Sequence, residues 1–273
     1  MEKKEQEYAK QTFSDVANIY DEIEFFKTSA QHMLDIIKKH TNKRDIQMLD
    51  VACGTGNVVL ECASFMPKST FDAIDISEGM LAKAKENAST KKLENITFQC
   101  KDISELASDK KYNVVTCAYA LFFLPNPIKV LVSLTKLLKP RGIIIFTSFT
   151  EEAFSPSSEI LLALLQKYGS STAKAYDANK WENLKTIKDI DRLCMMSYVS
   201  DMQIQTEQIR YGMDVDAWWE LLNNTGFKGM LMELSDENYE KVKSEYYKAM
   251  LAHADMDGEV ELIADSYFVT IKG

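Results

Sequence analysis

The sequence predicts a doubly wound α/β fold, in which a mostly parallel sheet lies between two layers of helices. Between residues 46 and 149, short apolar runs alternate with amphipathic segments of helical period. A strand, a helix and a second strand form a βαβ unit, and successive units build a parallel sheet that is covered on both faces. Of the 273 residues, 46% are hydrophobic and 27% are charged, so the chain can bury a core of its own.

The elements of this core follow from their periodicity, in chain order. Apolar runs predict strands at residues 46–51, 70–76, 96–100, 112–118 and 143–149. Amphipathic patterns predict helices at residues 57–66, 78–89 and 127–138. In such folds ligands bind beyond the carboxyl ends of the strands, so the site is expected in the loops that follow them.

Helical patterns flank the core and predict a cover for that site. Residues 13–40 carry apolar side chains at helical spacing, and several helical patterns follow the core. The patterns after residue 202 predict a strand at 204–211, helices at 215–224 and 236–252, and a β-rich end at 260–271 that closes the sheet. The expected parts are a helical lid (1–45), a core (46–150), a helical insertion over the active site (151–202) and a C-terminal part that completes the sheet and the substrate pocket (203–273).

The distribution of charge argues against a nucleic-acid partner. The formal net charge is −9, and residues 1–150 hold 20 basic and 19 acidic side chains, whereas residues 151–273 hold 12 and 22. The second part would repel a phosphate backbone, and no basic stripe is present to bind one. Nucleic acid is therefore not a predicted partner.

Cysteine usage and hydropathy predict a cytoplasmic protein without a membrane span. The five cysteines are odd in number and show no CxxC spacing, which indicates free thiols in a reducing compartment. No apolar run reaches the roughly 18 residues of a membrane helix, and the first ten residues contain no hydrophobic signal core. The three histidines lie in no metal-binding pattern, so no protein-bound metal is predicted. The oligomeric state is left open.

The most informative segment is residues 49–57, LDVACGTGN, where the first predicted strand turns into a helix. Glycines in such a turn adopt positive φ and let backbone N–H groups approach a ligand. The dinucleotide pattern GxGxxG fails, because Val59 stands where the third glycine belongs, and no GK[ST] follows to make a P-loop.

Instead, Asp50 followed by Ala52, Gly54 and Gly56 resembles the first motif of class I S-adenosylmethionine-dependent methyltransferases, acid-x-[GA]-x-G-x-G. Asp75 ends the second predicted strand 25 residues later, and Asp102 follows the third. Two further segments carry the resemblance: LLKPRG at 137–142, similar to the family's LKPGG turn, and SEGML at 77–81, similar to the S-x-x-M-L helix opening of the ubiquinone and menaquinone biosynthesis subgroup.

The resemblance implies a seven-stranded Rossmann-like sheet and S-adenosylmethionine as cofactor, with S-adenosylhomocysteine as product. It implies that Asp75 binds the ribose hydroxyls, that Asp102 meets the adenine amino group and that the carbonyl of Cys117 meets the cofactor ammonium. Tyr20, after Phe13, would cover the methionine end. The cofactor residues that it implies are Tyr20, Asp50, Ala52, Gly54, Gly56, Asp75, Ile76, Met80, Asp102, Ile103 and Cys117.

Structural alternatives exist for several of these residues. Asp50 and Asp75 have the position of helix N-caps, and an acid in a polar loop such as Asp102 is usually solvated. Tyr20 also fits the core face of an ordinary amphipathic helix.

The acceptor should meet the methyl group after the fourth predicted strand, where Tyr119 and Phe122 are the candidate substrate residues. Core packing is the alternative for both. No motif identifies a catalytic base, so the catalytic residues stay unassigned. The absence of [DN]PP[YF] after that strand argues against an exocyclic-amine acceptor.

Because the second half is acidic and rich in apolar residues at helical spacing, a small, partly apolar acceptor that is neutral or cationic is predicted. An NAD-type oxidoreductase or epimerase and a non-catalytic S-adenosylmethionine-binding protein are the alternative functions.

Overall fold

The computed structural model describes residues 20–41, 45–103, 110–124, 126–176 and 180–273, together with Ser14 and Ala17. Phe13 and most of the segment before Tyr20, which belong to the predicted lid, lie outside the described residues. No helix within the described ranges is long and apolar enough to cross a membrane.

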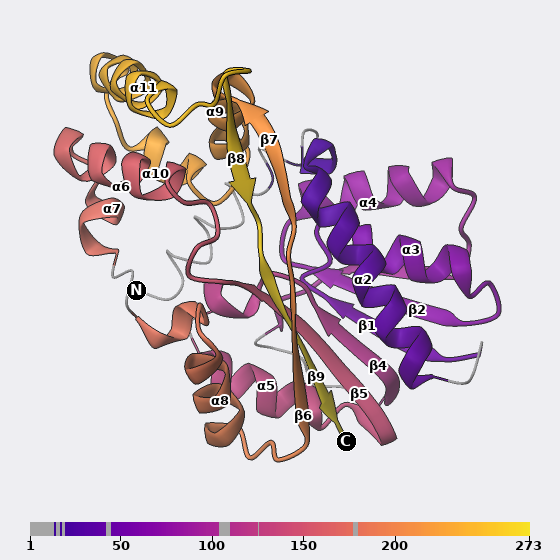
Figure 1. Ribbon diagram of the computed structural model, residues 1–273. Helices are drawn as coiled ribbons and strands as arrows, with labels where there is room; N and C mark the ends of the chain where they lie inside the picture. The colour runs from indigo at the N-terminus through magenta and orange to yellow at the C-terminus, as the bar shows by residue number, and fades with distance from the viewer. Residues whose placement is uncertain are drawn as a thin grey trace.

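A seven-stranded sheet in the order β3-β2-β1-β4-β5-β9-β6 forms the centre of the molecule (Figure 1). β1 to β5 run parallel, whereas β9 is antiparallel to both β5 and β6. This confirms the predicted α/β fold with a mostly parallel sheet. The strands are β1 (Gln47–Val51), β2 (Thr70–Asp75), β3 (Ile96–Cys100), β4 (Tyr112–Cys117), β5 (Leu138–Phe149), β6 (Met202–Glu207) and β9 (Ser266–Lys272).

Helices cover both faces of this sheet because its strands are apolar on both sides. Successive residues such as Ile143 and Ile144 belong to the cores on opposite faces, as the two-residue period of a strand requires. One core packs α2 (Glu24–His40), α3 (Asn57–Phe65) and α4 (Glu78–Thr90) against the sheet. The other core packs α5 (Pro127–Thr135), the short η4 (Trp181–Asn183) and α8 (Ile187–Met196).

A separate group of elements, here called the cap, packs around a third core beyond one end of the sheet. Its largest buried side chains are Trp218, Trp219 and Tyr246, and the indole of Trp218 donates a hydrogen bond to the carbonyl of Val260 (3.1 Å). The cap contains α6 (Ser157–Tyr168), α7 (Ser171–Ala175), α9 (Val215–Asn223), α10 (Lys228–Met232), α11 (Asp236–Leu251) and the two-stranded ribbon of β7 (Arg210–Asp214) and β8 (Glu259–Ile263).

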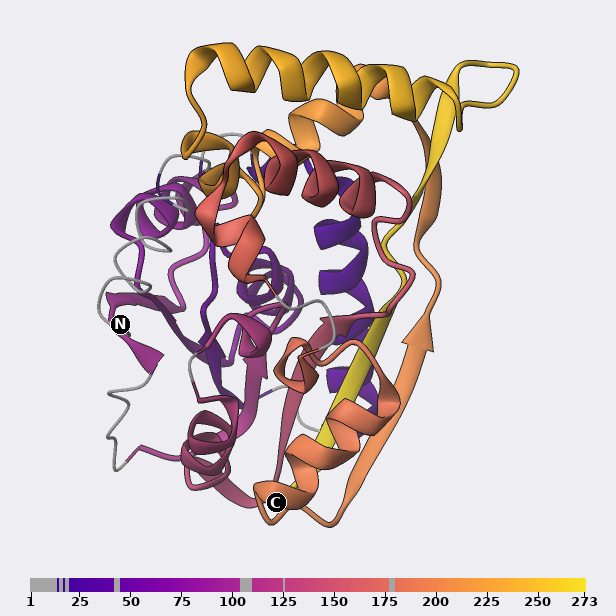
Figure 2. The same cartoon turned by 90° about the vertical axis from the view of Figure 1, so that its left-hand side faces the viewer.

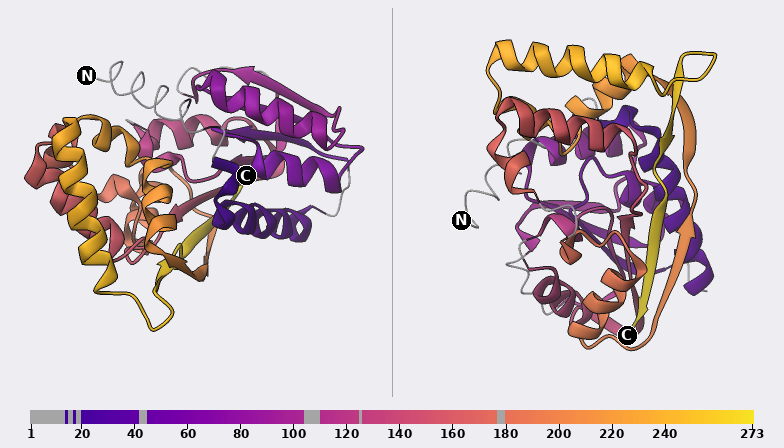
Figure 3. Two further views of the ribbon diagram at one scale, coloured as in Figure 1. Left: turned by 90° about the horizontal axis from the view of Figure 1, so that it is seen from above. Right: turned by 60° about the vertical axis from the view of Figure 1, so that its left-hand side comes forward.

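The cap lies on the side where the parallel strands end. Figures 2 and 3 place α11 at one end of the molecule and the C-terminus, where β9 finishes, at the other. Because β9 runs antiparallel to β5, the carboxyl ends of β5 and its parallel neighbours point toward the cap. The cap therefore stands over the edge at which ligands of such folds bind.

The structure corrects two expectations for the second half. The predicted strand at 204–211 is two strands, β6 and β7, and the predicted β-rich end at 260–271 is β8 and β9. The two segments leave the main sheet together and continue as the two-stranded ribbon. The predicted insertion at 151–202 also divides, since α6 and α7 join the cap while α8 packs against α5 on a face of the sheet.

Gly142 provides a test of the pairing between β4 and β5, whose register shifts between Tyr112 and Val114. A Cβ at Gly142 would lie 2.9 Å from the carbonyl oxygen of Lys139 and 3.0 Å from that of Tyr112. Since backbone cannot retreat cheaply, Gly142→Ala should lower the free energy of unfolding by roughly 1 to 3 kcal/mol in urea denaturation. Gly258→Asn is the control: Gly258 has φ +83 and open space, which asparagine tolerates, so its stability should stay close to that of the wild type.

Candidate functional site

The turn between β1 and α3 alternates left-handed and ordinary backbone. Ala52, Gly54 and Gly56 have φ values of 52, 55 and 92. The turn is tied to the neighbouring strand, because the N–H of Cys53 donates to the carbonyl of Ile74 (3.0 Å). A Cβ at Gly56 would lie 3.2 Å from Leu60 Cδ1, whereas one at Gly54 would meet nothing within 4 Å. Close packing thus demands glycine at 56, and the open side at Gly54 leaves room for a ligand.

Asp50, near the end of β1, is buried with only one of its carboxylate oxygens bonded. Oδ1 accepts a hydrogen bond from Thr116 Oγ1 on β4 (2.6 Å), and Oδ2 has no hydrogen-bond partner. Burial raises the pKa of this carboxyl from 3.8 to about 7, although the hydroxyl of Thr116 and the backbone N–H of Val59 favour the charged form. Gly56, and not Asp50, is the N-cap of α3, so the structure does not support a capping role for Asp50.

Asp75, the last residue of β2, joins the turn to the next helix. Its Oδ2 accepts from the N–H of Gly54 (2.8 Å) and its Oδ1 from the N–H of Ser77 (2.8 Å). Burial raises the pKa of Asp75, and these N–H groups oppose the rise. Ser77 is the N-cap of α4, so Asp75 is free of that role. Each carboxylate oxygen can accept more than one bond, which leaves Asp75 able to bind hydroxyl groups.

The segment that contains Tyr20 lies across the turn and is here called the strap (Ser14, Ala17 and residues 20–22). Asp21 Oδ2 accepts a bond from Asn87 Nδ2 (2.7 Å), and Asn87 also donates to the carbonyl of Thr55 (3.2 Å). Ser14 Oγ is 2.8 Å from Ser77 Oγ at the start of α4. Tyr20 lies in the short η1 (Tyr20–Glu22) and stacks on Phe26, with ring centroids 4.6 Å apart. The strap is therefore bonded to α4 and, through Asn87, to the turn, and its aromatic ring packs on α2.

A small cavity of about 50 Å³ lies between the strap and the turn. Five of the predicted site residues line it: Tyr20, Asp50, Ala52, Gly54 and Tyr119. Phe26, Ser29 and Asn57 also line it, and the sequence did not single them out. Asp50, whose Oδ2 has no hydrogen-bond partner, is thus among the residues that line a cavity bounded by aromatic rings, by the turn and by small side chains.

The other predicted cofactor residues do not line this cavity, but all lie at the same edge of the sheet or just beyond it. Met80 is buried against Tyr20 and Ala17, and the half-buried Ile76 accepts a weak bond from Cys100 Sγ (3.5 Å). Asp102 is half-buried in the loop after β3, next to Ile103, which packs in the core with Ile74. Burial raises the pKa of the Cys117 thiol, so this side chain is chemically inert there.

The two candidate substrate residues lie next to each other beyond β4. Tyr119 has a positive φ of 50, and its N–H donates to Thr147 Oγ1 (2.9 Å). Its ring stacks on Phe149 (4.4 Å between centroids), and Phe122, in the short η3 (Leu121–Phe123), lies 6.0 Å from the same ring. Burial raises the pKa of Tyr119 to about 12, so its phenol keeps its proton at neutral pH and cannot act as a base.

Comparison with known proteins gives one family and a well-defined fold. A family model described as a methyltransferase domain matches residues 42–215. The malonyl-[acyl-carrier protein] O-methyltransferase of Halalkalibacterium halodurans is 30% identical over 150 residues, which cover 52% of this chain and 55% of that protein. The chain thus spans about half the length of the curated relatives it matches.

Two solved structures share the fold over nearly all of the chain. The YcgJ protein of Bacillus subtilis superposes with a TM-score of 0.59 at 15% identity, covering 89% of this chain and 98% of that one. The plantazolicin methyltransferase BpumL, solved in complex with SAH, gives a TM-score of 0.55 at 18% identity over 98% of this chain and 95% of that one. At such identities the likeness shows the fold alone.

The raised pKa of Asp50 predicts how stability depends on pH. The folded state holds this proton more tightly than the unfolded chain, so the stabilisation is complete below pH 3.8 and is lost as the pH rises through about 7. The free energy of unfolding falls by about 4 kcal/mol over this pH range. Asp50→Asn lacks the ionisable group and should not show this fall. The melting temperature of the variant relative to the wild type should therefore rise by several degrees between pH 5 and pH 8 in calorimetry without ligand.

Asp191→Asn, at an exposed position of α8, is the control for the change from carboxyl to amide. The difference in melting temperature between this variant and the wild type should not rise by several degrees between pH 5 and pH 8. A pH-independent difference for Asp50→Asn would show that the carboxyl ionises as freely as in the unfolded chain.

Proposed function

Because the chain belongs to the methyltransferase domain family, we propose that it transfers a methyl group from S-adenosylmethionine to a small molecule. One observation carries the proposal: Asp50, a buried carboxylate with an unpaired oxygen, lines a cavity together with the turn between β1 and α3 and the aromatic residues Tyr20, Phe26 and Tyr119. A cationic group would pair with the charged form of this carboxyl, since a buried charge is stable only when it is paired.

The residues at this edge fit the chemical groups of that cofactor. Asp50 Oδ2 suits an ammonium group, and Asp75, with acceptor capacity left on both oxygens, suits a pair of ribose hydroxyls. The faces of Tyr20, Phe26 and Tyr119 suit a sulfonium, because aromatic rings attract cations. When bound, the cofactor supplies a methyl group on positively charged sulfur, with a neutral thioether as leaving group.

The chain's own contribution is placement and exclusion of water. The strap covers the turn through the bonds of Asp21 and Ser14, so the reacting groups are shielded from solvent. Holding two reactants in line removes much of the entropic barrier, which is worth about 7 to 11 kcal/mol in favourable cases. Tyr119 keeps its proton at neutral pH because burial raises its pKa to about 12.

We propose an acceptor that is small, partly apolar and neutral or cationic. The cap that stands over the site has a core of tryptophan, tyrosine and leucine, and the second half of the chain holds 22 acidic against 12 basic residues. The relative from Halalkalibacterium halodurans is named for a malonyl group on a carrier protein, but the acidic cap here would repel an acidic acceptor. We also place the protein in the cytoplasm, where its five cysteines can remain free, and assign no nucleic-acid partner.

Cofactor binding depends on Asp75 in this account. Asp75→Asn removes the negative charge that accepts hydrogen bonds from the ribose hydroxyls. The affinity for S-adenosylhomocysteine is expected to fall by about tenfold or more, since a hydrogen bond to a charged group is worth about 1.5 to 3 kcal/mol. Calorimetric titration with S-adenosylhomocysteine and, separately, with NADH checks this, and only the former should bind. Unchanged affinity in the variant, or binding of NADH alone, contradicts the assignment.

The acceptor class can be tested with methyl-labelled cofactor. Amines, phenols, quinols, carboxylates, tRNA and a protein extract are incubated with the enzyme at low and high salt, and label is followed into each. We expect transfer to a neutral or cationic small molecule with weak dependence on salt. Transfer confined to nucleic acid or to phosphorylated compounds, with strong inhibition by salt, contradicts the proposed acceptor.

A further inference from the structure

The main sheet and the cap are joined at a junction where two strands cross together from one to the other (Figure 1). β6 pairs with β9 as far as Glu207 and Ser266, and β7 pairs with β8 from Arg210 and Ile263 onward. Residues 208–209 and 264–265 lie between the two ladders. Backbone bonds are incomplete there, although the N–H of Ala264 still donates to the carbonyl of Ile209 (2.8 Å).

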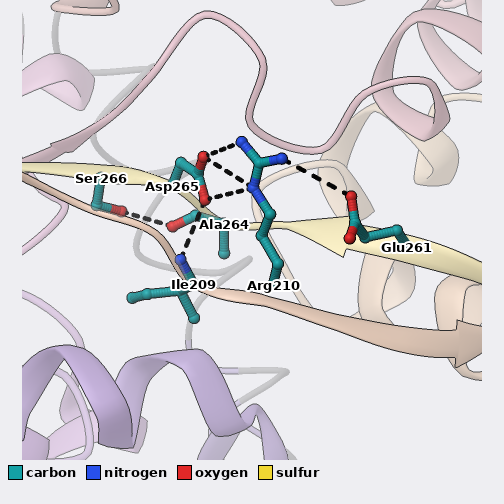
Figure 4. A network of polar contacts seen from close by, with 6 residues as sticks. All are labelled: Ile209, Arg210, Glu261, Ala264, Asp265 and Ser266. Carbon is teal, nitrogen blue, oxygen red and sulfur yellow. Dashed lines mark hydrogen bonds and ion pairs between the residues drawn. The ribbon is translucent and has the colours of Figure 1, made fainter.

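The side chain of Asp265 forms hydrogen bonds across this gap between the two ladders, as Figure 4 shows. It is almost fully buried, and its Oδ1 accepts from the backbone N–H of Ile209 (3.0 Å). Arg210 donates to both of its oxygens, from Nε to Oδ1 (3.1 Å) and to Oδ2 (3.0 Å) and from Nη2 to Oδ2 (2.5 Å). A bidentate bond between guanidinium and carboxylate is strong and directional, and Asp265 is held from a third side because its carbonyl accepts from the N–H of Thr150 (2.9 Å).

A directed chain of hydrogen bonds leads from this junction to the site. Ser266 Oγ donates to the carbonyl of Ala264 (2.8 Å), and the hydroxyl of Tyr119 donates to Ser266 Oγ (2.9 Å). Tyr119 has one hydroxyl proton, so the contact of its oxygen with Ser29 Oγ (2.6 Å) requires Ser29 to be the donor. Every proton in the chain has an acceptor, and the phenol of Tyr119 is fixed between α2 and β9.

The far end of this chain is a wall of the cofactor cavity, because the ring of Tyr119 lines it. Arg210 and Asp265 do not line the cavity. We propose that Arg210 and Asp265 are positioning residues, which fix residues 264–266 and, through Ser266, set the place of the Tyr119 ring against the bound cofactor. The fixed junction also ties the position of the cap to that of the ring. This inference rests on the proposed function, because it needs the cavity to bind the cofactor.

The test is a double-mutant cycle read by the affinity for S-adenosylhomocysteine, measured by calorimetry well below the melting temperatures of all variants. Arg210→Gln and Tyr119→Phe should each weaken binding by about three- to tenfold, as expected for residues that act through a coupled network. The affinity of the double variant should be at most about twofold below that of the single variant that binds less tightly. Without the hydroxyl of Tyr119, the junction no longer acts on the Tyr119 ring.

The control is Lys167→Gln, which removes an exposed ion pair with Glu245 elsewhere in the cap and should leave the affinity within about twofold of the wild type. If Arg210→Gln does not fold, Ser266→Ala takes its place in the cycle, because it keeps the ion pair and deletes the hydroxyl that accepts from Tyr119 and donates to the carbonyl of Ala264.

The inference is overturned if the fold-losses of affinity of the two single variants multiply in the double variant. It is also overturned if Arg210→Gln, or Ser266→Ala in its place, binds S-adenosylhomocysteine as tightly as the wild type. Failure of the wild-type protein to bind S-adenosylhomocysteine overturns the proposed function instead, so the two failures are distinguishable.

Discussion

A carboxylate buried at the end of the first strand is the constraint on which the site depends. Asp50 stays in the sheet because Thr116, on the adjacent strand, donates to one of its oxygens. Its other oxygen has no bond, and burial of such a group is unfavourable unless a cation or a proton neutralises it. The raised pKa expresses the same cost, since the protein without a cation favours the neutral acid. A positively charged ligand would therefore stabilise the charged form of Asp50.

The elements around Asp50 place further binding groups and enclose the site. Asp75 connects the glycine turn to α4 through two backbone N–H groups, so the second acid and the turn are placed together. The strap closes over them through Asn87, which bonds both to Asp21 and to the carbonyl of Thr55 within the turn. Tyr119 completes the enclosure, with its hydroxyl held by serines of α2 and β9. Ser266, from the second half of the chain, thus holds a residue that lines the same cavity as Asp50.

The sequence predicted the core well and the second half less well, for physical reasons. The strands and helices from 46 to 149 repeat with clear periods, so their positions were predicted within a few residues, apart from the early start of β5 at Leu138. The ladder breaks at 208–209 and 264–265 were not predictable, because the bond that repairs them comes from one side chain, Asp265, with no pattern around it. Asp50 and Asp75 were found through their motif, whereas Ser29 and Ser266 are single polar residues in apolar stretches and become visible only when the fold brings them together.

The most direct test of the central claim is a crystal structure of the protein with S-adenosylhomocysteine. We predict that the ligand lies along residues 50–56, with its ammonium group within hydrogen-bond distance of Asp50 Oδ2 and its ribose hydroxyls on Asp75. The strap should remain over the ligand through Tyr20. A ligand bound elsewhere, or an Asp50 Oδ2 that still lacks a partner in the complex, would contradict the account.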